Sequence, residues 1–266
     1  VILQGENSAA WIIAALGIIR AGGVVIPLDS QLMSDTLAYI IEDSSAKWAF
    51  LHEKKEEHLR ENFPNITIQA YHLDTDSSNP KSSHQLSGEK PKEIPKTDPG
   101  EIAVQFYTSG TTGKPKGVPL THSNLLHEVN TCVEIKFQDE GDRLLNPLPL
   151  SHVFPFAACM LVALTVGVPI IIPYAMTGPE MMRAIREGDA TIMTGVPRLL
   201  RALYEGIVNK ARMSGKLNWF LFNTLFGFNK FLIRTTGLNI GKTLLQSLHK
   251  KVSPKLRLFI CGGAAF

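Results

Sequence analysis

The sequence EIAVQFYTSGTTGKPKGVPLTHSNLL, from Glu101 to Leu126, contains a strand, a polar loop and a second strand in close succession. Residues 102–107 are mostly apolar, which predicts a buried strand. The nine residues that follow, Thr108 to Lys116, hold four hydroxyl groups, two glycines and two lysines. A second short strand is predicted over 117–120. The segment therefore predicts a polar loop held between two strands.

The composition of this loop suits the binding of a polyphosphate. Gly110 and Gly113 can adopt positive φ and let backbone N–H groups approach a ligand closely. Lys114 and Lys116 add positive charge. Hydroxyl donors are available from Thr108, Ser109, Thr111 and Thr112. A flexible surface turn would use similar residues, but so long a run directly after a buried strand favours a binding loop.

The loop is not a Walker loop. That motif needs a glycine five residues before the Gly-Lys pair and a serine or threonine directly after it. Here those positions are Thr108 and Pro115. Pro115 also prevents the immediate helix whose N-terminus holds phosphate in such enzymes.

The remaining sequence alternates short β-branched runs with helical patterns. Strands are predicted over 24–28, 47–52, 67–73, 168–174, 190–196 and 256–261, and helices over 9–20, 35–43, 125–134, 179–187 and 198–212. We expect Thr121 or Ser123 to cap the helix after the loop. This alternation predicts an α/β fold with a largely parallel sheet covered by helices on both faces. The apolar run 157–172 is too short to span a bilayer and predicts a buried helix followed by a buried strand.

One stretch interrupts the alternation and suggests the domain organisation. Residues 74–100 are rich in Ser, Pro and Lys, and their aliphatic residues are Leu86 and Ile94. We expect an exposed connector here, between a first α/β lobe, 1–73, and a second, 101–266. Both ends of the chain look cut, since an apparent strand has nothing before it and Phe266 follows a glycine turn.

Composition excludes several classes of protein. The chain of 266 residues is 44% hydrophobic and 19% charged, an ordinary globular balance. Cys132, Cys159 and Cys261 lie far apart, which argues against a disulfide framework and favours a reducing, cytoplasmic setting. The eight histidines form no HExxH motif, and we expect no metal site built by the protein.

Positive charge is concentrated near the C-terminus. Residues 207–257 contain ten Lys or Arg and no Asp or Glu, although the net charge is only +3. The same block holds six aromatic residues, Trp219, Phe220, Phe222, Phe226, Phe228 and Phe231. Two interpretations stay open: an interfacial helix in peripheral contact with an anionic membrane, and a helical hairpin packed on the core with a solvated basic rim. Nucleic acid is not an expected partner, because no recognition motif accompanies the charge.

Four segments resemble one family. YTSGTTGKPKGVPLTHSNLL is similar to the phosphate-binding signature of the adenylate-forming superfamily, which includes acyl-CoA synthetases, adenylation domains of peptide synthetases and luciferases. IRAGGVVIPLD at 19–29, PLPLSHVFPF at 147–156 and LRLFICGGAAF at 256–266 resemble other segments of that family, in the same order. The resemblance spans nearly the whole chain and implies the N-terminal portion of the adenylate-forming fold, with 101–266 as the ATP-binding lobe.

The resemblance also implies a two-step reaction. A carboxylate attacks the α-phosphate of ATP, which is bound with Mg²⁺, to give an acyl-adenylate and pyrophosphate. A thiol, usually that of CoA as second substrate, then takes the acyl group. Matching positions assign to the β- and γ-phosphates Thr108, Ser109, Gly110, Thr111, Thr112, Gly113 and Lys116. Lys114 is the less certain lysine and is expected to be solvated.

Two further positions are carried over from the family. His152 matches a residue between the acyl pocket and the nucleotide that can gate the thiol, although such a histidine alone is more often structural. Gly262, Gly263 and Ala264 match the turn that packs on adenine, and Ala265 stands where the family commonly has proline. The residues expected to carry catalysis are therefore Thr108, Lys116 and His152.

The aromatic, basic block at 207–257 resembles long-chain fatty acyl-CoA synthetases more than peptide-synthetase domains. The small molecules expected to bind are accordingly ATP, a fatty acid and CoA. A domain that loads a carrier protein and a non-catalytic nucleotide-binding module are the alternatives. The family's ribose-binding Asp, hinge and C-terminal domain with its catalytic lysine match nothing up to Phe266, so we expect this chain by itself to be inactive.

Overall fold

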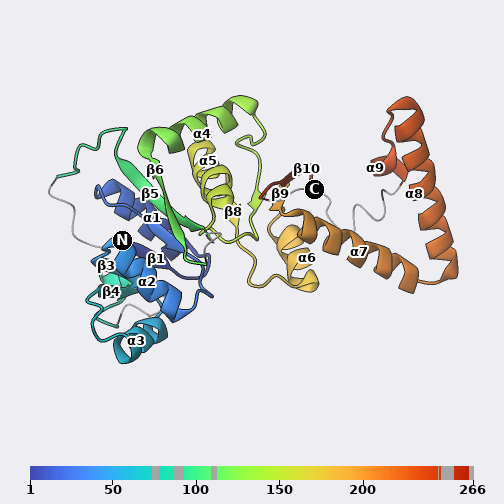
Figure 1. The fold of residues 1–266 in the computed structure, drawn as a ribbon. Helices are drawn as coiled ribbons and strands as arrows, with labels where there is room; N and C mark the ends of the chain where they lie inside the picture. Colours follow the sequence, from blue (N-terminus) through green and yellow to red (C-terminus); the bar gives the residue numbers. More distant parts are fainter. Residues whose placement is uncertain (74–77, 87–92, 109–112, 245, 247–254, 264–266) are drawn as a thin grey trace. The chain divides into compact units, whose positions relative to one another are not determined.

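The computed structural model describes residues 1–73, 78–86, 93–108, 113–244, 246 and 255–263. The chain divides into two compact units. The first comprises Val1–Phe137 and Pro149–Thr165, and the second comprises Gln138–Leu148 and Val166–Phe266. Both units combine parallel strands with helices, so the predicted α/β class is confirmed (Figure 1).

The first unit contains a four-stranded parallel sheet in the order β2-β1-β3-β4. Its strands are β1 (Ile2–Gln4), β2 (Ile26–Leu28), β3 (Trp48–Leu51) and β4 (Gln69–His72), and its connecting helices are α1 (Ala9–Arg20), α2 (Ser34–Ser44) and α3 (Glu53–Asn62). The Ser8 side chain caps α1 by accepting a hydrogen bond from Trp11 N at 3.1 Å, and Gly22 follows the helix with φ of +74°. Large apolar side chains between sheet and helices, such as Ile2, Leu37 and Leu51, are fully buried.

A β-hairpin is attached to this sheet. β5 (Ile102–Thr108) pairs antiparallel with β6 (Lys116–Thr121), and α4 (His122–Ile135) follows. Backbone hydrogen bonds join β5 to the chain just before β2, from Val25 N to Ala103 O at 3.0 Å and from Gln105 N to Val25 O at 2.8 Å. The predicted cap of α4 is Thr121, whose Oγ1 accepts from Asn124 N at 3.2 Å. The hairpin and its loop are thus fixed to the first sheet.

The apolar run 157–172 forms a largely buried helix followed by a strand, as predicted, but the strand is half buried rather than buried. The helical part begins as a π-helical segment, η2 (Pro155–Leu161), and continues as α5 (Val162–Val166). Gly167, with φ of +81°, then leads towards β8 (Ile170–Ile171). In the part of the chain that the structure describes, no helix has the length and apolar character needed to cross a bilayer.

The second unit has its own parallel sheet, in the order β10-β9-β7-β8. Besides β8, its elements are β7 (Leu144–Leu145), β9 (Ile192–Gly195), β10 (Leu258–Cys261), α6 (Gly178–Glu187), α7 (Pro197–Met213), α8 (Lys216–Thr236) and α9 (Gly241–Leu244). Residues 256–261 were expected to be a buried strand, but β10 is only half buried, and Phe259 is 48% exposed. The reason is that β10 pairs with β9 alone among the described strands.

Part of the predicted connector is attached to the first unit. Residues 74–77 and 87–92 lie outside the described residues, but 78–86 are described and include a short 3₁₀ helix, η1 (Ser83–Leu86). His72 N donates to Lys81 O at 2.7 Å, and Ser82 is fully buried. This part of the connector is therefore docked rather than free. The boundary between the compact units falls after it, and β5 and β6 belong to the first unit.

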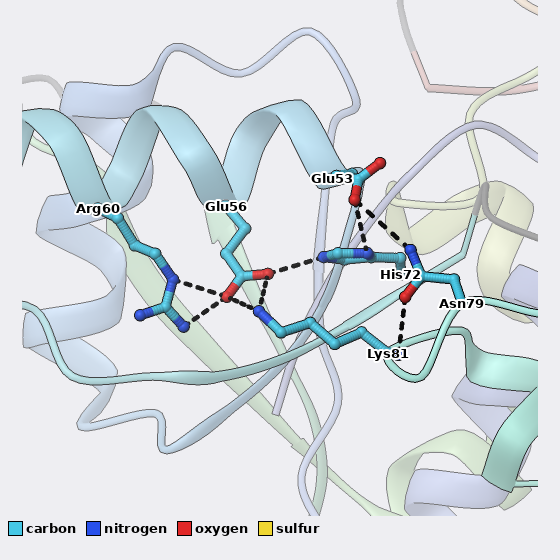
Figure 2. A network of polar contacts seen from close by, with 6 residues as sticks. All are labelled: Glu53, Glu56, Arg60, His72, Asn79 and Lys81. Carbon is cyan, nitrogen blue, oxygen red and sulfur yellow. Dashed lines mark hydrogen bonds and ion pairs between the residues drawn. The ribbon is translucent and has the colours of Figure 1, made fainter.

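A buried carboxylate holds the docked segment (Figure 2). Glu56 of α3 is 3% exposed and accepts hydrogen bonds from Lys81 Nζ at 2.7 Å and from Arg60 Nε at 2.8 Å. Its other oxygen lies 2.7 Å from His72 Nε2. Burial alone would raise the pKa of Glu56, but the hydrogen bonds from Lys81, His72 and Arg60 outweigh burial and hold the pKa at about 2.

Candidate functional site

The register of the hairpin brings the two ends of the polar loop together. Thr108 is the direct cross-strand partner of Lys116, and Tyr107 is that of Gly117. Directly opposed residues project to the same face with Cβ atoms roughly 5 Å apart. The Thr108 hydroxyl and the exposed Lys116 side chain therefore start from neighbouring points. Ser109, Gly110, Thr111 and Thr112 lie outside the described residues.

One face of the hairpin carries both Thr108 and the segment that contains His152. Side chains two residues apart share a face of a strand, so Thr108 lies on the face of Phe106. The rings of Phe106 and Phe156 meet edge to face with centroids 5.6 Å apart. Phe156 N donates to His152 O at 3.0 Å. The structure thus places the exposed His152 one helical turn before the residue that packs on this face.

The part of the 147–156 segment that belongs to the first unit, from Pro149 onwards, is fixed at several points. Leu150 N donates to the side chain of Asn7, in the loop after β1, at 2.9 Å. His152 N donates to Pro149 O at 3.1 Å. The Ser151 hydroxyl is buried, and no partner for it is found in the part of the chain that the structure describes. Sequence reasoning missed Ser151, whose one signal was its place beside His152.

The opposite face of the hairpin is hydrogen-bonded to α2. Tyr107 donates its hydroxyl proton to Asp43 Oδ2 at 2.7 Å and accepts a hydrogen bond from Gln105 Nε2 at 3.0 Å. Tyr39 donates to the other oxygen of Asp43 at 3.5 Å. Burial, followed by the neighbouring Asp43 carboxylate, raises the pKa of Tyr107 to about 12. These contacts anchor the base of the loop.

The two lysines of the loop have different surroundings. The Lys114 ammonium lies over the ring of Tyr39, 5.4 Å from its centroid, which is a cation–π contact. Lys114 is exposed, as expected, and its ammonium also contacts α2 through the Tyr39 ring. Lys116 projects with Thr108 from the other face of the hairpin. The two lysines therefore differ: Lys114 contacts Tyr39 of α2, whereas Lys116 starts opposite Thr108.

Two glycines permit the geometry of this hairpin. Gly113 has φ of +86°, a conformation that other residues rarely adopt. Gly117 lies so close to Gln105 that an added Cβ would come within 2.6 Å of Gln105 Nε2. Sequence reasoning selected Gly113 and missed Gly117, which faces Tyr107 and leaves room for the contacts with α2.

The predicted adenine turn lies in the second unit. Gly262 N donates to Gly195 O at 3.2 Å, and Gly263 has φ of +80°. Both glycines follow the carboxyl end of β10, beside that of β9, which is the edge where parallel α/β sheets bind ligands. Ala264 lies outside the described residues.

A polar hollow of about 630 Å³ lies at the carboxyl ends of β1, β2 and β3. Its lining is Glu6, Ser30, Gln31, Ser34, His52, Lys54, Lys55 and His58. Two lysines against one carboxylate favour an anionic group. Sequence reasoning missed this hollow, whose weak signal was the presence of polar residues directly after three predicted strands.

The donors at the hairpin suit phosphate oxygens rather than Mg²⁺. Ammonium and N–H groups cannot ligate a cation, which takes carboxylate, carbonyl or water oxygens. Within the described ranges, no three His, Cys, Asp or Glu side chains come together as a metal site.

We predict that Tyr107→Phe, which keeps the ring and removes the hydroxyl, lowers the free energy of unfolding by about 1.5 kcal/mol, because a hydrogen bond to a carboxylate is lost. Since the pKa of Tyr107 is raised from 10 to about 12, its stabilising contribution is present below pH 10 and lost as the pH rises towards 12. Urea unfolding measures both effects. Tyr71→Phe is the control, since the Tyr71 hydroxyl accepts a longer hydrogen bond, of 3.3 Å, from the neutral Gln69 side chain. Equal losses in both variants would contradict the anchoring role.

Comparison with known proteins agrees with this geometry. A family model described as "AMP-binding enzyme" matches residues 1–266. Long chain acyl-CoA synthetase 8 of Arabidopsis thaliana is 26% identical over 99% of this chain and 41% of its own length. Tyrocidine synthase 3 of Brevibacillus parabrevis is 27% identical over 76% of this chain and 3% of its own length. The chain thus spans well under half of these relatives.

Solved structures show the same architecture. MbtA of Mycobacterium smegmatis superposes with a TM-score of 0.68 at 26% identity, over 77% of this chain and 40% of that one. ATP-bound MatB of Rhodopseudomonas palustris superposes with a TM-score of 0.65 at 24% identity, over 76% and 40%. The second likeness is one of fold alone.

Proposed function

Because this chain belongs to the AMP-binding enzyme family, we propose that it is the ATP-handling part of a ligase that activates a fatty acid as an acyl-adenylate and passes the acyl group to CoA. Thr108 and Lys116 would hold the β- and γ-phosphates together with Ser109, Gly110, Thr111, Thr112 and Gly113. Gly262, Gly263 and Ala264 would lie against adenine. Mg²⁺ bound to the nucleotide would neutralise part of the phosphate charge.

The pairing of Thr108 with Lys116 carries this proposal. When the carboxylate attacks the α-phosphate, the bond to the β-phosphate breaks and negative charge grows on the departing pyrophosphate. An ammonium and a hydroxyl that start from facing positions of the hairpin would stabilise that charge. Lys114 is less suited to this role, because its ammonium already lies over the Tyr39 ring.

His152 would act in the second half-reaction. It lies on the side of the hairpin that carries Thr108, at the start of the helix through which Phe156 packs on that face. We give it a positioning role, in which its ring guides the thiol towards the acyl-adenylate. His152→Ala should then slow thioester formation more than adenylation, and the two half-reactions can be timed separately.

Two relatives support two different acyl acceptors. The similarity to a protein named as a long-chain acyl-CoA synthetase favours a fatty acid and CoA. The similarity to tyrocidine synthase 3 keeps adenylation for a carrier protein as a second candidate. The aromatic, basic helix α8 supports the first candidate, because its sequence resembles long-chain synthetases.

The experiment is acid-dependent exchange of pyrophosphate into ATP, catalysed by the full-length protein and measured with a panel of fatty and amino acids. We expect exchange with long-chain fatty acids and none with amino acids, and then thioester formation with CoA. Exchange with amino acids alone would favour the carrier-loading candidate. Binding of ATP without exchange for any acid would indicate a non-catalytic module.

A further inference from the structure

Helix α8 packs on α7 through one face. The two helices are joined at Ser214 and Gly215, and the ring centroids of Tyr204 and Phe226 lie 6.1 Å apart. Trp219 and Phe222 continue this inner face, and the Arg212 guanidinium lies over the Trp219 ring, 5.0 Å from its centroid. These contacts account for three of the six aromatic residues of the 207–257 block (α7 and α8 in Figure 1).

The opposite face of α8 is apolar and exposed. We call it the outer stripe, and its residues recur at the helical spacing of three and four. The exposed fractions are 71% for Leu217, 65% for Phe220, 48% for Leu221, 50% for Phe228 and 60% for Phe231. Single exposed apolar residues are normal, but five on one face of a helix mark a contact surface.

A basic edge runs along one side of the outer stripe. Lys216 and Arg234 are five helical turns apart, so at about 100° per residue they lie on the same side of the helix. Lys230 is rotated about 40° from them around the helix axis. All three are exposed. The full block 207–257 contains no acidic residue.

Two of the basic residues of this block are engaged elsewhere in the second unit. Lys255 Nζ lies 2.8 Å from Asp189 Oδ2, and Arg257 Nε donates to Asp142 Oδ1 at 2.8 Å. Arg257 holds the pKa of Asp142 at about 2. Because Lys255 and Arg257 form ion pairs within the second unit, the positive charge beside the outer stripe comes from the basic residues of α7 and α8.

Two binding partners could cover the outer stripe, a second copy of the chain or an anionic lipid surface. The charge pattern favours the lipid surface. A second copy of the chain, packed stripe to stripe, would offer the basic edge no acidic partner from its own 207–257 block. An anionic lipid surface can bind both the apolar outer stripe and the basic edge. Its acyl region accepts Phe and Leu side chains, and its headgroup phosphates attract Lys and Arg.

We propose that α8 lies in the surface of an anionic membrane, with the outer stripe at the boundary between headgroups and acyl chains and the basic edge on lipid phosphates. The helix lies on the membrane and does not span it. This surface is independent of the proposed ligase function, because it requires neither the loop nor a nucleotide.

The test is co-sedimentation of the protein with vesicles of phosphatidylcholine mixed with phosphatidylserine, and with vesicles of phosphatidylcholine alone. We expect binding to the mixed vesicles that weakens as salt rises, since charges are screened over about 10 Å at 0.1 M. Lys216→Gln, Lys230→Gln and Arg234→Gln combined should weaken binding roughly 10²-fold. Phe220→Ser, Phe228→Ser and Phe231→Ser combined should abolish it.

The matched control removes the same number of positive charges from the first unit. Arg20→Gln, Lys47→Gln and Lys136→Gln combined remove three exposed cations from the first unit and should leave vesicle binding within about twofold of the parent. Circular dichroism checks that each variant is folded. Absence of binding to mixed vesicles, or an equal loss in the control, would overturn the proposal. A dimer in sedimentation velocity that the Phe→Ser changes dissociate, without vesicle binding, would identify the outer stripe as a self-association face instead.

Discussion

Replacing Lys116 with alanine should lower kcat for adenylation roughly 10²–10³-fold, the loss expected when one strong donor to developing charge is removed. The Lys116 side chain starts opposite Thr108, and its ammonium would contact the departing pyrophosphate more strongly than ground-state ATP. Thioester formation from pre-made acyl-adenylate should change far less, because pyrophosphate has already left. Rapid-quench assays of the two half-reactions in the full-length protein measure both rates.

Lys114→Ala is the matched control, since it removes an identical charge two residues away. Its ammonium lies over Tyr39, so we expect a smaller loss of kcat. The assignment fails if Lys116→Ala slows both half-reactions equally, which would point to a folding role. It also fails if Lys114→Ala is the more damaging change.

Glu56→Gln should lower the free energy of unfolding at pH 7 by about 3 kcal/mol. The pKa of Glu56 falls from 4.5 to about 2 on folding, and a tenfold change in proton affinity corresponds to about 1.4 kcal/mol. Because folding depresses this pKa, the stabilisation is present above pH 4.5 and is lost as the pH falls towards 2. The unfolding curves of parent and variant should therefore converge in acid.

Glu57→Gln provides the control for that experiment. Glu57 is the exposed neighbour of Glu56, and its loss should change stability by less than about 0.5 kcal/mol. Limited proteolysis gives a second readout, because cleavage within residues 78–86 should become faster when Lys81 loses its buried partner. Equal effects of the two substitutions would show that Glu56 is not a specific anchor.

Much of the fold could be predicted from the sequence because each element has a local cause. The strand–loop–strand–helix order of 101–126, the cap at Thr121 and the helix–strand order of 157–172 are confirmed, although β8 is half buried rather than buried. Alternating apolar runs predicted the parallel sheets, since strands buried on both faces need apolar side chains throughout. These patterns depend on neighbours within a few residues.

What the sequence did not reveal depends on distant partners. Helix α3 has a single aliphatic residue, Leu59, so no apolar period marked it, and its buried face is completed by a charged residue, Glu56. The docking of 78–86 relies on that same carboxylate. Similarly, the anchor between Tyr107 and Asp43 joins residues 64 positions apart, and neither side chain is unusual in its local sequence.

The register of the β5–β6 hairpin constrains how this protein can evolve. A one-residue slip in a strand turns every side chain to the other face. A single insertion between Gly113 and Lys116 that shifted β6 by one position would turn Lys116 towards α2 and place its side chain among Gln105 and Tyr107. An insertion that the loop absorbs would leave this pairing unchanged and cost little, because loop closure depends weakly on length. Changes of loop length near Lys116 should therefore be tolerated where the register of β6 is kept and be harmful where it slips.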